Sequence, residues 1–202
     1  EVGTVQLDIT RPGDDSVNEE RIGFPARVHA NNTGATGEGK TSSCANPETG
    51  SLWWGIDLPA GVTGLDLDID TVGSPIDTRL VVSTAGGEVG CNDDVVPGTL
   101  WSQVRVDDAA DFENGFADLY VRVDGYNNAQ GDISLNVTTR GDDIHNAIGL
   151  GNAVPASATN TNTYATVEAD EQRGSCHYQA DAPGQTVWYR WTSPASFYYA
   201  VQ

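Results

Sequence analysis

Four oxygen-bearing side chains near the middle of the chain have the types and spacing of calcium ligands. Asp77 precedes the apolar segment Leu80–Ser83, and Asn92, Asp93 and Asp94 follow it. Hard cations such as calcium bind several carboxylate and amide oxygens that loops bring together. If these residues lie at strand ends on one edge of a sheet, they form a calcium site. The alternative is a turn in which the same side chains cap local backbone N–H groups.

Two other acidic patterns are weaker candidates for cation binding. Asp66, Asp68 and Asp70 alternate along one segment, but acids on the same face of a strand stay about 7 Å apart. The sequence Gly-Asp-Asp occurs at residues 13–15 and again at 141–143. We interpret these two copies as linker turns that set the angle between successive domains, with a bridging cation as the alternative. The chain contains no twelve-residue EF-hand loop.

The residues that catalysis requires do not form a recognisable pattern. His29, His145 and His177 lie in loop-like segments without an evident partner. The sequence has no Gly-x-Ser-x-Gly, His-Glu-x-x-His or glycine-rich phosphate-binding motif. We therefore expect a protein without enzymatic activity.

Aromatic and amide side chains offer two further kinds of site. An exposed row of aromatic side chains would suggest a carbohydrate-binding platform, but alternate residues of a strand face opposite ways. Core packing is therefore the preferred interpretation of this set: Trp53, Trp54, Trp188, Tyr189 and Trp191. Asn31 and Asn136 lie in Asn-x-Thr sequons and are candidate glycosylation sites if the host glycosylates exported proteins.

Short alternating segments indicate the elements that would position these residues. In residues 65–70, Leu65, Leu67 and Ile69 face one way and the three aspartates face the other, as in a half-buried strand. No segment has a convincing helical pattern, so we expect seven to nine short antiparallel strands in a sandwich or jelly roll. The expected strands include residues 26–29, 52–58, 65–70, 80–83, 104–106, 119–123 and 133–137.

The chain also repeats itself. Residues 3–15, GTVQLDITRPGDD, are echoed 128 positions later by residues 131–143, GDISLNVTTRGDD, and residues 52–60 are echoed by 187–195. Self-similarity over this distance indicates tandem domains. We expect residues 1–11 to be the last strand of a preceding repeat or a donated strand. We expect residues 12–140 to form a complete repeat, and residues 141–202 to be the first half of the next, completed by further chain or by a neighbouring subunit. A donated strand would present Val5, Leu7 and Ile9 to a neighbouring subunit.

The odd number of cysteines fits this repeat. Cys44 precedes the strand that begins at Leu52, and Cys176 precedes the strand that echoes it. We therefore expect Cys44 to pair with Cys91, and Cys176 to pair with an equivalent of Cys91 in the following repeat. The alternative is free buried thiols. A disulfide would place the protein in an oxidising compartment outside the cytoplasm.

Composition excludes several functions. The chain has 29 acidic and 10 basic residues and a net charge of −19, which disfavours nucleic acid and anionic lipid as partners. No run of 18 or more apolar residues is present, so we expect no membrane insertion.

Four motifs in order resemble a known family. They are a Trp/Tyr strand ending in Pro-Ala (188–195, with 53–60 as the earlier copy), Asp-Thr-x-Leu (77–80), Asn-Asp-Asp (92–94) and Val-Asp-Gly-Tyr (123–126). This order resembles the pre-peptidase C-terminal domain, which recurs in tandem in large secreted bacterial and archaeal proteins. The resemblance covers most of residues 12–140 and both flanking segments, although residues 16–50 match nothing we can place. It implies a non-catalytic β-sandwich jelly roll.

Together these observations favour a structural repeat of an extracellular or cell-surface fibre, stalk or adhesin. Its partners would be adjacent repeats or copies of itself, joined head to tail. The alternative is an accessory module of a secreted hydrolase that binds the substrate or a carbohydrate. An exposed aromatic patch would favour the alternative, whereas regular end-to-end contacts would favour the structural role.

Overall fold

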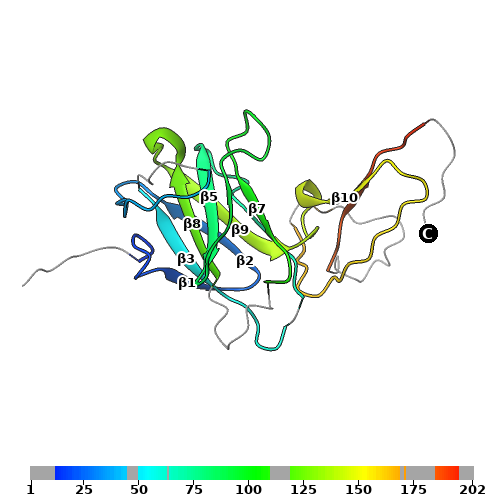
Figure 1. Cartoon of the computed structure of the whole chain (residues 1–202), viewed down its shortest axis with the longest axis horizontal. Coiled ribbons are helices and arrows are strands. Elements are labelled where there is room, and N and C mark those ends of the chain that lie inside the picture. Colours follow the sequence, from blue (N-terminus) through cyan, green and yellow to red (C-terminus); the bar gives the residue numbers. More distant parts are fainter. Residues whose placement is uncertain are drawn as a thin grey trace, which may run out of the picture.

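Two β-sheets stacked face to face form the larger part of the molecule, and a small two-stranded sheet lies beyond them (Figure 1). The computed structural model describes residues 12–44, 50–62, 64–109, 119–168, 171 and 185–195. In this part of the chain the regular structure is all-β apart from two 3-10 turns, η2 (Tyr126–Asn128) and η3 (Ile144–Asn146). No helix among these residues is long and apolar enough to cross a membrane.

The first sheet has five strands in the order β1-β3-β8-β5-β6, and the second has four in the order β2-β9-β4-β7. The strands of the first sheet are β1 (Glu20–Gly23), β3 (Leu52–Asp57), β5 (Thr78–Thr84), β6 (Gly87–Asn92) and β8 (Leu119–Gly125). Those of the second are β2 (Ala26–Asn31), β4 (Leu67–Asp70), β7 (Gln103–Val106) and β9 (Asp132–Thr139). The described structure is therefore a β-sandwich, as the sequence predicted.

The core lies between the two sheets and comes from the alternating apolar residues. Leu67 and Ile69 on β4 face Leu80 and Val82 on β5, and all four are fully buried. Trp54 is also part of this core and is 1% exposed. Trp53 points to the other face of β3 but is buried as well, with Lys40 and Arg122 against its ring. Core packing is therefore confirmed for Trp54, whereas Trp53 is buried outside the core. The prediction is wrong for Tyr189, which is 42% exposed, and Trp188 and Trp191 are only partly buried.

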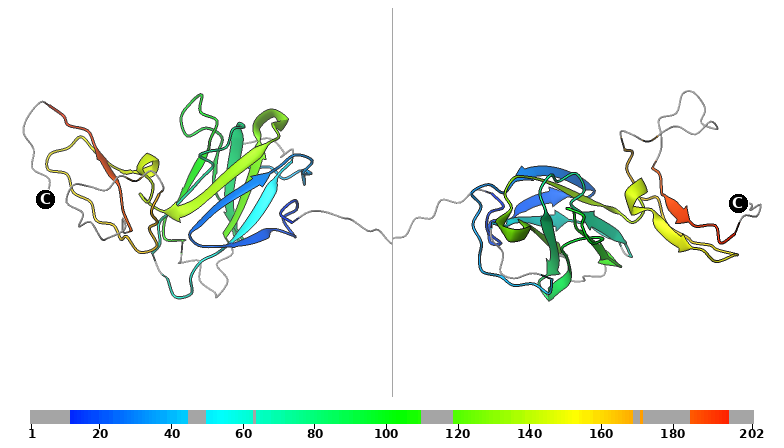
Figure 2. Two further views of the ribbon diagram at one scale, coloured as in Figure 1. Left: turned by 180° about the vertical axis from the view of Figure 1, so that it is seen from behind. Right: turned by 90° about the horizontal axis from the view of Figure 1, so that it is seen from above.

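The structure corrects the prediction of a wholly antiparallel fold. β1 pairs with β3 in parallel, with Glu20 opposite Trp54. The pair β10 (Ile148–Gly151) and β11 (Tyr189–Trp191) is also parallel, with Ile148 opposite Tyr189. A parallel pair requires a long connection, and residues 24–51 supply it for β1 and β3. Figure 2 shows β10 and β11 at the opposite end of the molecule from β1.

A disulfide joins the connection before β3 to the edge strand β6. Cys44 and Cys91 are bonded, with their Cα atoms 5.6 Å apart. The predicted pairing is therefore present, whereas Cys176 lies outside the described residues.

Candidate functional site at a buried polar junction

The outer face of the four-stranded sheet is covered around β4, which corrects the sequence-based interpretation of its aspartates, although Arg27 and Arg105 on the same face remain exposed. Asp68 and Asp70 do face away from the core, but both are 0% exposed. The chain leaves β9 at Thr139 and turns back over this face, so that residues 141–146 cover it. Asp142, Asp143 and Asn146 are at most 1% exposed. We call the contact between this segment and the sheet the junction.

A glycine makes the turn into the junction. Gly141 has φ +77°, and a Cβ there would lie 2.9 Å from Ile148 side-chain atoms, so both its conformation and its surroundings require glycine. Its N–H lies 3.3 Å from Asp68 Oδ2, and its carbonyl accepts the N–H of Trp188 at 2.8 Å. Gly141 therefore ties the sheet on one side to the β11 segment on the other.

Asp68 and Asp70 are held by donors from both sides of the junction. Arg105 Nε donates to Asp68 Oδ1 at 2.9 Å. Asp70 accepts from Asn136 Nδ2 on β9 and from Asn146 Nδ2 on the covering segment, each at 2.7 Å. His145 Nε2 lies 3.5 Å from Asp70 Oδ2. Two of the three side chains in the predicted outward row, Asp68 and Asp70, are thus the base of a buried network. The third, Asp66, is partly exposed and pairs with Arg140 at 3.1 Å.

Arg27 joins a second group of acids in the same network. From β2 its guanidinium donates to Asp143 Oδ1 and to Glu168 Oε1, each at 2.8 Å. Asp142 accepts the Thr166 hydroxyl at 2.7 Å, and the same hydroxyl lies 2.8 Å from Glu168 Oε1. One hydroxyl proton cannot serve both carboxylates, and Glu168 Oε2 is buried without a partner.

The resulting charge balance shifts several pKa values. Burial, reinforced by the charges of Asp143 and Asp142, raises the pKa of Glu168 to about 7 despite Arg27. Burial also raises the pKa of Asp142. For Asp70, burial works in the opposite sense to its hydrogen bonds from His145, Asn136 and Asn146, and the net effect is a lowered pKa. The same bond to Asp70 raises the pKa of His145. The junction therefore holds protons near neutral pH.

Two sets of junction side chains have ligand atoms within 4.8 Å of one another and could hold a cation: Asp70, Asp143 and His145, and Asp142, Asp143 and Glu168. Arg27 already provides positive charge to the second set, and Asn146 and Asn136 satisfy Asp70 in the first. Side chains of the protein can therefore compensate for the negative charge of these acids.

The predicted calcium ligands lie elsewhere, at the end of the sandwich where β5 begins and β6 ends. Asp77 and Asp93 each have a buried Oδ1 atom without a partner. Burial, with the charges of neighbouring Asp94 and Asp77, raises the pKa of Asp93, and burial together with Asp94 raises that of Asp77. Asn92 instead has both ends of its amide in use, because Oδ1 accepts from Gln103 N and Nδ2 donates to the Asp94 carbonyl. The charges of these carboxylates therefore interact, but Asp77, Asp93 and Asp94 are not among the described sets whose ligand atoms all lie within 4.8 Å of one another.

The start of the sandwich repeats the contacts of the junction segment. Asp14 accepts Thr36 N and the Thr36 hydroxyl, as Asp142 does with Thr166. The Gly13 carbonyl accepts Trp53 N at 2.7 Å, as Gly141 does with Trp188. The repeated motif is in fact Gly-Asp-Asp-x-x-Asn, residues 13–18 and 141–146. The recurring asparagine, Asn18 and Asn146, is the signal in the sequence that marks the junction.

The remaining predicted sites differ in accessibility. Asn31 is exposed at the end of β2 and donates to Asp132, whereas Asn136 is buried and donates to Asp70 and to the Val72 carbonyl. Only the first of these sequon asparagines is therefore open to a glycan in this fold. The residues of the predicted donor strand, Val5, Leu7 and Ile9, lie outside the described residues.

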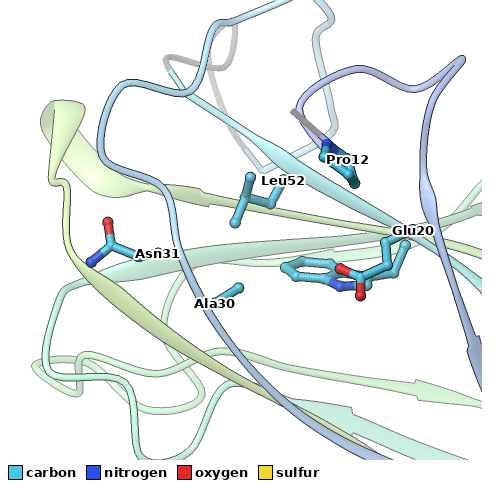
Figure 3. Close-up of a pocket in the computed structure, with 7 residues that line it drawn as sticks. Pro12, Glu20, Ala30, Asn31 and Leu52 are labelled. Carbon is cyan, nitrogen blue, oxygen red and sulfur yellow. The ribbon is translucent and has the colours of Figure 1, made fainter. Parts of the chain in front are cut away.

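A cavity of about 160 Å³ opens between the sheets where β1 and β2 meet. Pro12, Glu20, Ala30, Asn31 and Leu52 line it (Figure 3), together with Gly13 and Trp54. Trp54 Nε1 is buried and has no hydrogen-bond partner.

No family model and no curated protein matches this sequence. Among solved structures, it is similar to the pre-peptidase C-terminal domain of collagenase from Bacillus anthracis, with 11% sequence identity and a TM-score of 0.37. The match covers 59% of this chain and 93% of that domain. The chain resembles a pre-peptidase C-terminal domain. The sequence motifs predicted this resemblance.

Proposed function

We propose that this chain is a non-catalytic structural module of an extracellular fibre, stalk or surface adhesin, in which successive modules are joined head to tail. The observation that carries the proposal is the buried junction. A linker that merely tethers two domains is solvated, whereas here Asp68, Asp70, Asp142 and Asp143 are all at most 1% exposed. A buried, hydrogen-bonded network specifies one arrangement of its parts. This property suits a module that fixes the orientation of the next module in an array.

Two further features support the proposal. The repeated contacts at residues 13–18 and 141–146 provide every module with the same entry turn. The Cys44–Cys91 disulfide is typical of proteins outside the cytoplasm. An acidic surface without a nucleic-acid or membrane partner is also expected of such a module.

The test is electron microscopy of the native full-length protein. Long particles with a regular axial repeat are the expected result. Isolated particles without a repeat would contradict the structural role and favour the accessory module.

Calcium binding at Asp77, Asp93 and Asp94 is part of this proposal. Burial and the charge of Asp94 raise the pKa values of Asp77 and Asp93, and each of these two has a buried unpartnered oxygen, which suits a divalent cation. Repeating the microscopy after treatment with a chelator asks whether the cation also stabilises the array. Isothermal titration with calcium measures the site itself, and no heat of binding would argue for the turn-capping role.

The cavity favours a second candidate function, that of an accessory carbohydrate-binding module. The unpaired N–H of Trp54 needs an acceptor, and the Glu20 carboxylate at the same cavity accepts a donor. A sugar hydroxyl satisfies both. Binding on a glycan array that is abolished by Glu20→Gln would support this function. Binding to no glycan would contradict it and would mean that the cavity holds only water.

A further inference from the structure

The entry turn at residues 13–18 has the residues of a junction and contacts its own sheet at Trp53, but no second sheet covers it among the described residues. Asp15 corresponds to Asp143 and Asn18 to Asn146, and each pair has the same residue type. Asp143 and Asn146 are each 1% exposed and bind Arg27 and Asp70. Asn18 is exposed, Asp15 is partly exposed, and neither side chain has a partner among the described residues.

The two turns share part of their backbone geometry. Asn18 N donates to the Asp15 carbonyl at 3.0 Å, and Asn146 N donates to the Asp143 carbonyl at 3.0 Å. Gly13 has φ +78° and Gly141 has φ +77°. One bond differs. Gly141 N points at Asp68 of the sheet, whereas Gly13 N has no such acceptor and donates to the Asn18 carbonyl at 2.9 Å.

An exposed apolar side chain marks the same surface. Val17 is 82% exposed, the largest exposure among the large hydrophobic residues of the described chain. It occupies the position of His145, whose ring packs edge-on to Trp101 with 6.3 Å between centroids. A sheet placed on the entry turn as β4 and β7 are placed on residues 141–146 would therefore bring a tryptophan onto Val17.

We propose that residues 13–18 are a docking surface for the outer face of the four-stranded sheet of a second copy of this module, the one that precedes it in an array. Asp15 then pairs with Arg27 of that copy, and Asn18 binds its Asp70. This inference rests on the head-to-tail function proposed above and names the residues that make the contact. In this chain, residues 141–146 already cover the outer face of the four-stranded sheet. The partner is therefore the preceding module, in which residues 13–18 of this module take the place of residues 141–146.

The experiment adds one copy of the module to the chain. Residues 12–140 are followed directly by residues 13–202, so that Gly13 takes the place of Gly141, and the second copy carries ¹⁵N through segmental ligation. Amide hydrogen exchange is read at Asn18 of that copy. In the unmodified chain the Asn18 amide should exchange at least tenfold faster than that of Asn146, although both make the same 3.0 Å bond. In the two-copy chain it should slow at least tenfold, to the Asn146 rate.

Variants of the second copy identify the contact. Asp15→Asn and Asn18→Ala should each restore fast exchange of the entry turn in the two-copy chain and change nothing in the unmodified chain, where these side chains have no partner. Asp57→Asn, which changes an exposed acid at the far end of β3, is the matched control and should have no effect. If all variants are silent in both chains, the docking assignment is wrong.

Small-angle scattering of the two-copy chain separates this inference from the proposed function. An extended, rigid particle together with silent Asp15 and Asn18 variants would overturn only the docking surface. Two modules that move independently would overturn both the docking surface and the head-to-tail function.

Discussion

At the scale of single residues, the burial of the partner carboxylate decides how much an arginine contributes to stability. Arg27 and Arg21 have nearly equal side-chain exposure, 38% and 39%. Arg27 contacts Asp143, whose side chain is 2% exposed, whereas Arg21 contacts Asp57, whose side chain is 57% exposed. Water compensates for the loss of a partner at the second pair and cannot do so at the first.

This difference predicts unequal costs for the same substitution. Arg27→Gln leaves buried Asp143 and Glu168 without a cation, and it should lower the free energy of unfolding by about 2–3 kcal/mol. Arg21→Gln should cost less than about 1 kcal/mol, because exposed ion pairs contribute little. Urea unfolding of both variants at pH 7 measures the difference. Equal losses would show that the junction is no tighter than a surface pair.

A second prediction concerns Asp77. Without a cation, its charge repels those of Asp93 and Asp94, so Asp77→Asn should stabilise the protein in the presence of a chelator, by roughly 0.5–1 kcal/mol. With calcium bound, the same substitution removes a ligand and should lower the thermal midpoint. The change of sign between the two conditions is measured by differential scanning fluorimetry. A stabilising effect in both would mean that calcium does not bind there.

At the scale of elements, the sequence was informative where apolar and polar residues alternate along a strand. Strands β4, β8 and β9 alternate in this way, β3 carries an aromatic pair, and the positions of all four were predicted to within two residues. β1 and β6 were missed because Glu-Arg-Ile-Gly and Gly-Glu-Val-Gly-Cys-Asn carry too few apolar residues to alternate, and much of each is exposed at a sheet edge.

The junction could not be predicted because its two halves are distant in sequence. Asp68 and Asp70 are separated from Gly141 and Asn146 by more than seventy residues, as their hydrogen bonds record. Alternation shows that the two aspartates point away from the core, but not that another segment covers them. Only a pattern shared between the two turns, such as the repeated asparagine, carries that information in the sequence.

The pKa shifts predict a pH dependence of the junction. The folded-state pKa of Glu168 is about 7, whereas its ordinary value is 4.5. Between about pH 4.5 and 7 the folded state therefore binds more protons than the unfolded state, and stability falls as pH rises through this range. His145 acts in the same direction. Its pKa is raised, so the stability it contributes is present below about 6.5 and is lost as pH rises through its folded-state value.

The junction should accordingly be more stable at pH 5 than at pH 8. Exchange of the Asn146 amide at several pH values, corrected for intrinsic rates, measures this dependence. Glu168→Gln resembles the protonated acid, so it should slow exchange at the junction at pH 8 and change it little at pH 5. The pH dependence that remains in this variant should then be the part due to His145. Glu20→Gln serves as the control. Unchanged pH dependence in the Glu168 variant would assign the whole effect to other groups.

The disulfide should stabilise the sandwich by restricting the unfolded chain. Cys44 and Cys91 are 47 residues apart, and closing a loop of that size contributes about 4 kcal/mol in the chain-entropy model. Replacing both with serine, in a Cys176→Ser background that prevents rearrangement, should lower the free energy of unfolding by approximately this amount. A loss below about 1 kcal/mol in urea unfolding would mean that the connection before β3 is already ordered by other contacts.

At the scale of the whole molecule, the apolar core is distributed unequally along the chain. Every buried hydrophobic residue in the described ranges lies between residues 52 and 137, except Ala165. Beyond residue 140 the structure is held mainly by the polar junction and by Tyr164, whose ring packs edge-on to Phe24 at 5.8 Å. Burial of apolar area is the dominant favourable term in folding. The sandwich therefore has its own source of stability, and the β10–β11 segment depends on it.

This asymmetry predicts opposite behaviour for the two parts when they are separated. Residues 12–140 should fold cooperatively, because removing the junction exposes Asp68 and Asp70 to water, where carboxylates are well solvated, and costs the core only the Tyr164–Phe24 contact. Residues 141–202 alone should lack a cooperative transition, since Asp142 and Asp143 would lose Arg27 and the described residues there bury one apolar side chain. Calorimetry and amide dispersion in NMR spectra of both fragments measure this.

If residues 141–202 folded alone, the segment would be an independent domain and the boundary at residue 140 an ordinary linker. If residues 12–140 failed to fold, the junction would be part of the sandwich, and the repeating unit would have to be redrawn to include the turn that follows it.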